Sequence, residues 1–200
     1  MNKKSNVKRV LVNRDILTLL QALGNVEKEY LSYADTNANA DDRKDQINQL
    51  ERVFAYELYH QWAMIKEKNL FLNGEIGKIW TDDTWYPDLV LHGGQDDANN
   101  NRVVVEIKRE CMVNGKPEAI LNDLEKLSYF LDTVDKSSQE MKFRNYENAV
   151  FILLKGKLSD ISKALNHKNT SNKKLNNKII CITYNERKDI EISSLEDLKK

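Results

Sequence analysis

The stretch that decides the fold is RVVVEIKR, residues Arg102–Arg109. Its β-branched residues favour a strand, and side chains along a strand alternate between two faces. Three apolar side chains therefore share one face: Val103, Val105 and Ile107. Glu106 and Lys108 share the other face. We expect a strand whose one face packs in a core while its other face carries two ionisable groups.

A second strand is predicted at Tyr86–His92, and a third at about Leu70–Trp80. Gly93–Asn101, which is rich in Gly, Asp and Asn, is typical of a hairpin loop between the second strand and Arg102–Arg109. The three segments together predict an antiparallel meander.

The register of this hairpin determines which polar side chains meet. If the loop closes symmetrically, His92 pairs with Arg102 and Asp88 lies directly opposite Glu106. Two carboxylates opposed across a ladder have Cβ atoms about 5 Å apart, which is destabilising without compensation. A divalent cation supplies that compensation, and oxygen ligands are those that Mg²⁺ selects. Lys108 would then lie on the same face, beside the site. The alternative from spacing alone is a solvent-facing hairpin whose polar face holds an ion pair.

The spacing of an acidic residue two positions before a lysine is not informative by itself. It occurs five times in the chain: Asp42/Lys44, Glu106/Lys108, Glu140/Lys142, Glu186/Lys188 and Asp197/Lys199. Only Glu106/Lys108 ends a run of valines, and this strand context is what distinguishes it.

The remaining pattern predicts an α/β domain in which helices flank a mixed β-sheet. Apolar residues recur at helical spacing over Leu11–Leu31 and over about Asp42–Lys68. After the meander the predicted elements alternate between helix and strand. They are a helix from Pro117 to about Asp135, a strand at Ala149–Leu154, a helix at Leu158–Leu165 and a strand at Lys178–Thr183. With 200 residues, we expect one domain spanning 1–200.

Composition narrows the function classes. The 31 basic and 31 acidic residues cancel, which weighs against a protein that binds nucleic acid mainly through non-specific phosphate contacts. A local basic patch or a bound cation can still meet a phosphate. Cys111 and Cys181 are too few for a disulfide framework, and no apolar run is long enough for a membrane span. We therefore expect a cytoplasmic protein with no membrane partner.

The segments Tyr86-Pro87-Asp88-Leu89-Val90 and Val104-Val105-Glu106-Ile107-Lys108 resemble the PD-(D/E)xK signature of the restriction-endonuclease-like nuclease superfamily. The resemblance covers roughly Asp42 to Leu154. It implies a restriction-endonuclease-like mixed β-sheet flanked by helices, to which residues of about 1–40 add an N-terminal helix. It also implies that the two acidic positions and the Ile107 carbonyl hold Mg²⁺ or Mn²⁺, and that the lysine orients or activates the attacking water.

Many members of that superfamily carry a further acidic residue on the helix before the meander. Glu57 matches this position best, because it adjoins the apolar stripe of its helix, and Glu51 is the second choice. Weaker candidates are His92, which faces the predicted site, and Lys126 on the following helix. A core or surface histidine and a solvated lysine are the better interpretations of these two.

The sequence thus predicts a metal-dependent nuclease that hydrolyses phosphodiester bonds in DNA through Asp88, Glu106, Lys108 and Glu57. Two alternatives stay open: a non-catalytic nucleic-acid- or protein-binding module that keeps the fold, and an RNA-directed nuclease. Nucleic acid is the expected partner, and the sequence leaves open a homodimer or a partner protein.

Overall fold

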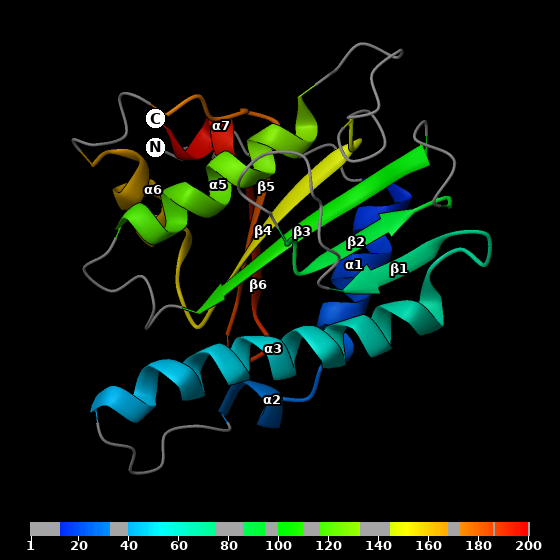
Figure 1. Ribbon diagram of the computed structural model, residues 1–200, viewed down its shortest axis with the longest axis horizontal. Helices are drawn as coiled ribbons and strands as arrows, with labels where there is room; N and C mark the ends of the chain where they lie inside the picture. Colours follow the sequence, from blue (N-terminus) through cyan, green and yellow to red (C-terminus); the bar gives the residue numbers. More distant parts are fainter. Residues whose placement is uncertain are drawn as a thin grey trace, which may run out of the picture.

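The computed structural model describes residues 13–32, 40–74, 86–94, 100–109, 117–132, 145–167, 173–185 and 187–199, without the side chains of 32 and 40–50. In this part of the chain a mixed six-stranded sheet is flanked by helices on both faces (Figure 1). The α/β class predicted from the sequence is confirmed.

The strands lie in the sheet in chain order. They are β1 (Phe71–Gly74), β2 (Leu89–His92), β3 (Asn101–Arg109), β4 (Asn148–Leu154), β5 (Ile180–Tyr184) and β6 (Ile190–Ser194). β1, β2 and β3 form the predicted antiparallel meander. β3, β4 and β5 are mutually parallel, and β6 pairs antiparallel with β5 at the edge. The long strand β3 therefore lies between the antiparallel and the parallel halves.

One face of the sheet packs against α1 (Arg14–Asn25), α2 (Glu29–Ser32) and α3 (Ala40–Ile65). The valines and isoleucine that alternate on β3 contribute Val103, Val105 and Ile107 to this core, as predicted. The helices contribute fully buried side chains, among them Ile16, Leu19, Leu23, Phe54, Leu58 and Trp62. The helices α1 and α2, which precede residue 40, are thus part of this core.

The other face packs against α5 (Pro117–Leu131), α6 (Leu158–Leu165) and α7 (Leu195–Leu198). This second core contains Val90 and Val104, which alternate with the first-core residues along β2 and β3. Glu106 and Lys108 follow Val104 in the same alternation, so they emerge on the α5 side of the sheet.

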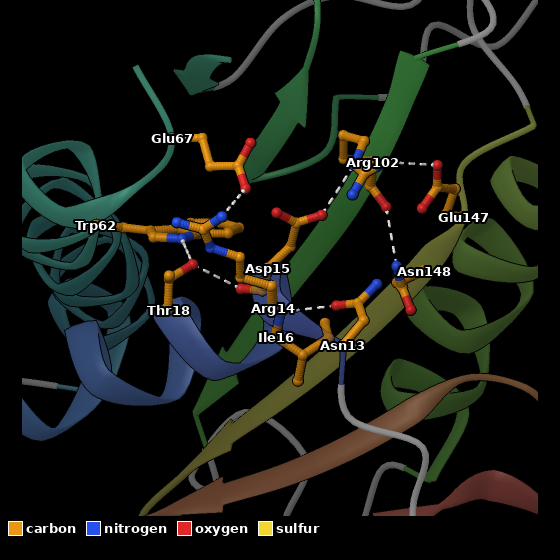
Figure 2. A network of polar contacts seen from close by, with 10 residues as sticks. All are labelled: Asn13, Arg14, Asp15, Ile16, Thr18, Trp62, Glu67, Arg102, Glu147 and Asn148. Atoms are coloured by element: carbon orange, nitrogen blue, oxygen red, sulfur yellow. Dashed lines mark hydrogen bonds and ion pairs between the residues drawn. The ribbon is translucent and has the colours of Figure 1, made fainter. Parts of the chain in front are cut away.

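A polar network fastens α1 to the sheet and to α3 (Figure 2). The Asp15 carboxylate, whose side chain is 3% exposed, accepts a 2.9 Å hydrogen bond from Arg102 Nε on β3. Arg102 also contacts the half-exposed Glu147 at 2.8 Å. Trp62 Nε1 on α3 donates to the Thr18 hydroxyl, which donates in turn to the Asp15 carbonyl. Asp15, the buried charge of the network, is thus paired with an opposite charge, as the burial of a charge requires.

Several predicted boundaries differ from the structure. The helix predicted over Leu11–Leu31 is interrupted, because Val26 is extended and ends α1. The strand predicted at Tyr86–His92 begins only at Leu89. β6 was not predicted, since its alternation rests on two isoleucines alone. Residues 75–80 of the strand predicted at about Leu70–Trp80 and residues 95–99 of the predicted hairpin loop lie outside the described residues.

The assumed hairpin register is wrong at one end. A bulge between Leu91 and His92 pairs His92 with Asn101 instead of Arg102. Leu89 nevertheless pairs with Val105, as the symmetric register requires. Continuing that ladder by one residue brings Asp88 opposite Glu106, which is the pairing that the candidate site needs.

Candidate functional site

Asp88 is hydrogen-bonded to Ile107, the middle residue of the Glu106-Ile107-Lys108 segment. Its Oδ2 accepts a 2.6 Å hydrogen bond from the Ile107 backbone N–H. In the continued register Pro87 would lie opposite Ile107, and proline has no N–H to donate to a ladder. In a hydrogen-bonded antiparallel pair, the N–H and the C=O of one residue both bond to the residue opposite. The N–H and C=O of a strand residue therefore point to the same edge of the strand. The Ile107 carbonyl therefore points toward the edge where Asp88 lies.

Glu106 is the most deeply buried carboxylate of the group, with 5% of its side chain exposed. Lys126 reaches from α5 and places its Nζ 2.7 Å from Glu106 Oε1. The same ammonium donates a 2.8 Å hydrogen bond to the Tyr86 carbonyl, just before Pro87. Lys126, for which the sequence favoured a solvated lysine, thus links β3 to the segment that precedes β2.

Lys108 lies between carboxylates from both helical layers. Its Nζ is 3.4 Å from Asp123 Oδ2 on α5 and 3.8 Å from Glu51 Oε2 on α3. The other oxygen of Glu51 accepts a 2.8 Å hydrogen bond from the Arg109 backbone N–H. Because β2 begins only at Leu89, the end of β3 extends past it, and side chains from both layers meet there.

These contacts gather four carboxylates and two ammonium groups at one end of β3: Glu51, Asp88, Glu106, Asp123, Lys108 and Lys126. Four negative and two positive charges leave a formal charge of −2. A partly buried cluster with excess negative charge favours either protonation of its carboxyls or binding of a cation.

The pKa values of the group follow from that imbalance. Burial raises the pKa of Asp88 to about 6, although the Ile107 N–H opposes the rise. Burial, and next the Asp88 charge, raise the pKa of Glu106 well above its usual value. Burial also raises the pKa of Glu51 and of Asp123, against the effect of Lys108.

The pKa of Lys108 is raised as well. Burial alone would lower it, but the carboxylates of Asp123, Glu51 and Asp88 outweigh that effect. An ammonium with a raised pKa keeps its proton at neutral pH, so Lys108 is a hydrogen-bond donor and a positive charge, and a poor base.

Two oxygens of the cluster are buried without a hydrogen-bond partner among the described residues, Glu106 Oε1 and Asp123 Oδ2. Each has an ammonium as its neighbour: Lys126 Nζ lies 2.7 Å from Glu106 Oε1, and Lys108 Nζ lies 3.4 Å from Asp123 Oδ2. Buried oxygens of this kind need a partner, and a small cation is one that fits.

The donor set suits a particular kind of metal. Within the described part of the chain, no group of three or more His, Cys, Asp or Glu side chains is arranged to hold a metal ion. Zn²⁺ in a structural site takes four protein ligands, whereas Mg²⁺ is usually held by one or two carboxylates and keeps water or substrate oxygens. Asp88 and Glu106, with the Ile107 carbonyl at the same edge, offer oxygen donors of the kind that Mg²⁺ and Mn²⁺ bind.

Glu57 does not join the cluster. Its Oε1 accepts a 2.7 Å hydrogen bond from Gln61 Nε2, and its charge raises the pKa of the Tyr30 hydroxyl. The α3 carboxylate that contacts Lys108 and Arg109 is Glu51, the second choice from the sequence.

The positions of Glu51 and Glu57 around the helix could have predicted which of them joins the cluster. At about 100° per residue, Glu51 projects within about 20° of both Leu58 and Trp62, which are buried against the sheet. Glu57 projects about 100° away from Leu58 on the same count. A carboxylate in the middle of an apolar stripe needs a buried partner, and this signal pointed to Glu51.

His92 is the last residue of β2, whereas Asp88 comes just before the first, so the two lie at different ends of this strand. Its Nε2 is 2.7 Å from Asn73 Oδ1, and its Nδ1 accepts a hydrogen bond from the Gly94 N–H. These contacts fix a neutral ring in which Nε2 carries the proton. The interpretation of His92 as a core histidine agrees with this placement.

Comparison of the chain with family models, with curated proteins and with solved structures finds no match. None of the described helices has the length and apolar character needed to cross a membrane.

Proposed function

We propose that this protein is a divalent-metal-dependent nuclease that hydrolyses phosphodiester bonds in DNA. The observation that carries the proposal is the joint placement of Asp88, Glu106 and Lys108 at the end of β3, where Asp88 is bonded to the backbone of the segment that holds the other two. The order of elements supports a restriction-endonuclease-like fold, since a helix and a three-stranded meander precede a helix and further strands.

In this proposal Asp88 and Glu106 hold Mg²⁺ together with the Ile107 carbonyl. The ion would polarise the scissile phosphate and stabilise the negative charge that develops on it. Asp88 is held in place by its hydrogen bond to Ile107, so its ligand position requires no rearrangement of the backbone. Hydrolysis forms a bond from the water oxygen to phosphorus and breaks the bond from phosphorus to the leaving sugar oxygen.

Lys108 is the group that orients the attacking water. It donates hydrogen bonds, because the surrounding carboxylates raise its pKa and keep it protonated. Glu51 and Asp123 hold its ammonium from opposite layers, which limits where it can lie. In this arrangement they are positioning residues that act through Lys108.

A second candidate is a binding module that keeps the fold without catalysis. The observation that favours it is the pairing of both lysines with carboxylates, which neutralises much of the cluster without a metal. An RNA-directed nuclease would use the same chemistry as a DNA nuclease.

One assay separates these candidates. Labelled single- and double-stranded DNA and RNA are incubated with the protein in Mg²⁺, Mn²⁺ or EDTA, with Glu106→Gln as the control. We expect DNA cleavage that needs the metal and is lost in the variant. Cleavage of RNA alone would favour the RNA-directed nuclease, and metal-independent binding without cleavage would favour the module.

A further inference from the structure

The two lysines of the cluster are held differently. Lys108 lies 3.4 and 3.8 Å from two carboxylates on opposite helical layers. Lys126 makes one close charged contact, 2.7 Å to Glu106, and donates to the carbonyl of Tyr86. Its ammonium is thus next to an oxygen that the proposed metal would need.

The contact between Lys126 and Glu106 is held by charge. Glu106 Oε1 is buried and has no hydrogen-bond partner among the described residues, although the ammonium is 2.7 Å away. A buried carboxylate that has Asp88 as its neighbour needs a compensating positive charge. Lys126 supplies this charge at 2.7 Å, and a divalent cation bound at the same oxygen would supply it instead.

Two cations cannot share this position without repulsion. A divalent ion between Asp88 and Glu106 would lie close to the Lys126 ammonium, and like charges in a partly buried site repel strongly. The side chain of Lys126 is 19% exposed, and its flexible stem allows the ammonium to move toward solvent. That is also the direction from which a phosphate would arrive.

We propose that Lys126 is an internal counter-cation that occupies Glu106 in the metal-free protein, competes with the divalent metal, and binds the substrate phosphate once displaced. This inference rests on the proposed metal site. It adds a regulatory consequence: a phosphate that holds the displaced ammonium lowers the cost of binding the metal, so metal and polyanion bind cooperatively.

The test is a calorimetric titration of Mg²⁺ into the full chain and four variants, each checked for folding by circular dichroism. Lys126→Gln removes the charge but keeps a donor for the Tyr86 carbonyl, and Lys126→Met is a second neutral variant. Lys126→Arg keeps the charge. Lys173→Gln is the matched control. Lys173 pairs with Glu125, which lies next to Lys126 on α5, and this pair is outside the cluster.

We expect both neutral variants to bind Mg²⁺ at least about tenfold more tightly than the wild type. This gain corresponds to a small part of the Coulomb repulsion between two cations about 4 Å apart. Lys126→Arg and Lys173→Gln should match the wild type. In the wild type a short phosphorothioate DNA should tighten Mg²⁺ binding, and in the neutral variants this tightening should be smaller, because only the direct contact between ion and phosphate remains.

The outcomes distinguish this inference from the proposed function. Binding in Lys126→Gln but none in the wild type would support the competition more strongly. Equal or weaker binding in the neutral variants, with clear binding in the wild type, would overturn the inference and leave the metal site in place. Absence of binding in every protein would overturn both.

Discussion

The carboxylate of Asp88 accepts a 2.6 Å hydrogen bond from the backbone N–H of Ile107, the residue between Glu106 and Lys108. One proposed ligand is therefore positioned by the backbone of the segment that carries the other two groups. Pro87, which has no N–H, is suited to the place before Asp88 because β2 has not yet begun there.

The first prediction concerns this carboxylate. Asp88→Asn removes the charge but keeps an oxygen that can accept the Ile107 N–H, so the fold should survive while Mg²⁺ and Mn²⁺ affinity is lost. Calorimetric titration measures this loss. Asp189→Asn, at an exposed turn beyond the cluster, is the control and should bind as the wild type does. Equal binding by Asp88→Asn would exclude Asp88 as a ligand.

The second prediction concerns pH. Asp88 has its pKa raised from 3.8 to about 6 by burial, so the folded protein holds this proton more tightly than the unfolded chain. Protonated Asp88 therefore stabilises the folded state below pH 4, and this contribution is lost as pH rises through about 6. It amounts to at most about 3 kcal/mol in the free energy of unfolding. In EDTA, Asp88→Asn should therefore flatten the fall in unfolding free energy between pH 4 and 6.

Metal should reverse this trend, because a cation binds the ionised carboxylates. The rise in melting temperature caused by Mg²⁺ should be small at pH 5 and full at pH 7.5. Urea unfolding and thermal melts across this range check both statements. A melting shift that is equally large at pH 5 would contradict the role of Asp88 and Glu106 as metal ligands.

The third prediction concerns Lys108. Lys108→Ala and Lys108→Met leave the carboxylates of Asp88 and Glu106 in place, so metal binding should persist. If Lys108 positions the attacking water, cleavage should fall by a factor on the order of 10²–10⁴. Lys163→Ala, which removes an exposed lysine paired with Asp160, is the control. Undiminished cleavage in both Lys108 variants would assign Lys108 a structural role only.

The fourth prediction separates two glutamates on one helix. Glu51→Gln and Glu57→Gln are the same nearly isosteric change. Glu51→Gln removes a charge next to Lys108, so it should lower the pKa of Lys108 and slow cleavage, with the Arg109 N–H bond retained. Glu57→Gln should leave cleavage and metal affinity unchanged, since Glu57 contacts Gln61. Loss of activity in Glu57→Gln with normal Glu51→Gln activity would reverse this assignment.

The fifth prediction concerns the network of Figure 2. Asp15→Ala leaves Arg102 without its buried partner, and Glu147→Ala removes only a half-exposed one. The first should lower the free energy of unfolding by about 1.5–3 kcal/mol, as for the loss of a hydrogen bond between charged groups of which one, Asp15, is buried. The second should change it by at most about 1 kcal/mol, as for surface ion pairs. Chemical denaturation measures both, and equal effects would show that Asp15 is not the dominant partner.

The α/β class and part of the candidate site could be predicted from the sequence because they depend on local periodicity. The alternation along β3 placed Val103 and Val105 on one face and Glu106 on the other, and the structure keeps these faces. The same periodicity did not predict the bulge after Leu91, because a bulge changes the pairing without changing the side chains.

The sequence by itself therefore determined the α/β class, the meander and the alternation that puts Glu106 and Lys108 on one face of a strand. Only the tertiary structure decided that Glu51 lies at Lys108 while Glu57 does not, and that Lys126 reaches Glu106. Strand alternation is fixed by the covalent geometry of neighbouring residues. Contacts such as that between Glu51 and Arg109, 58 residues apart, depend on how a helix is rotated and shifted against the sheet. The packing of whole elements sets that rotation, because it is the packing that buries their apolar faces.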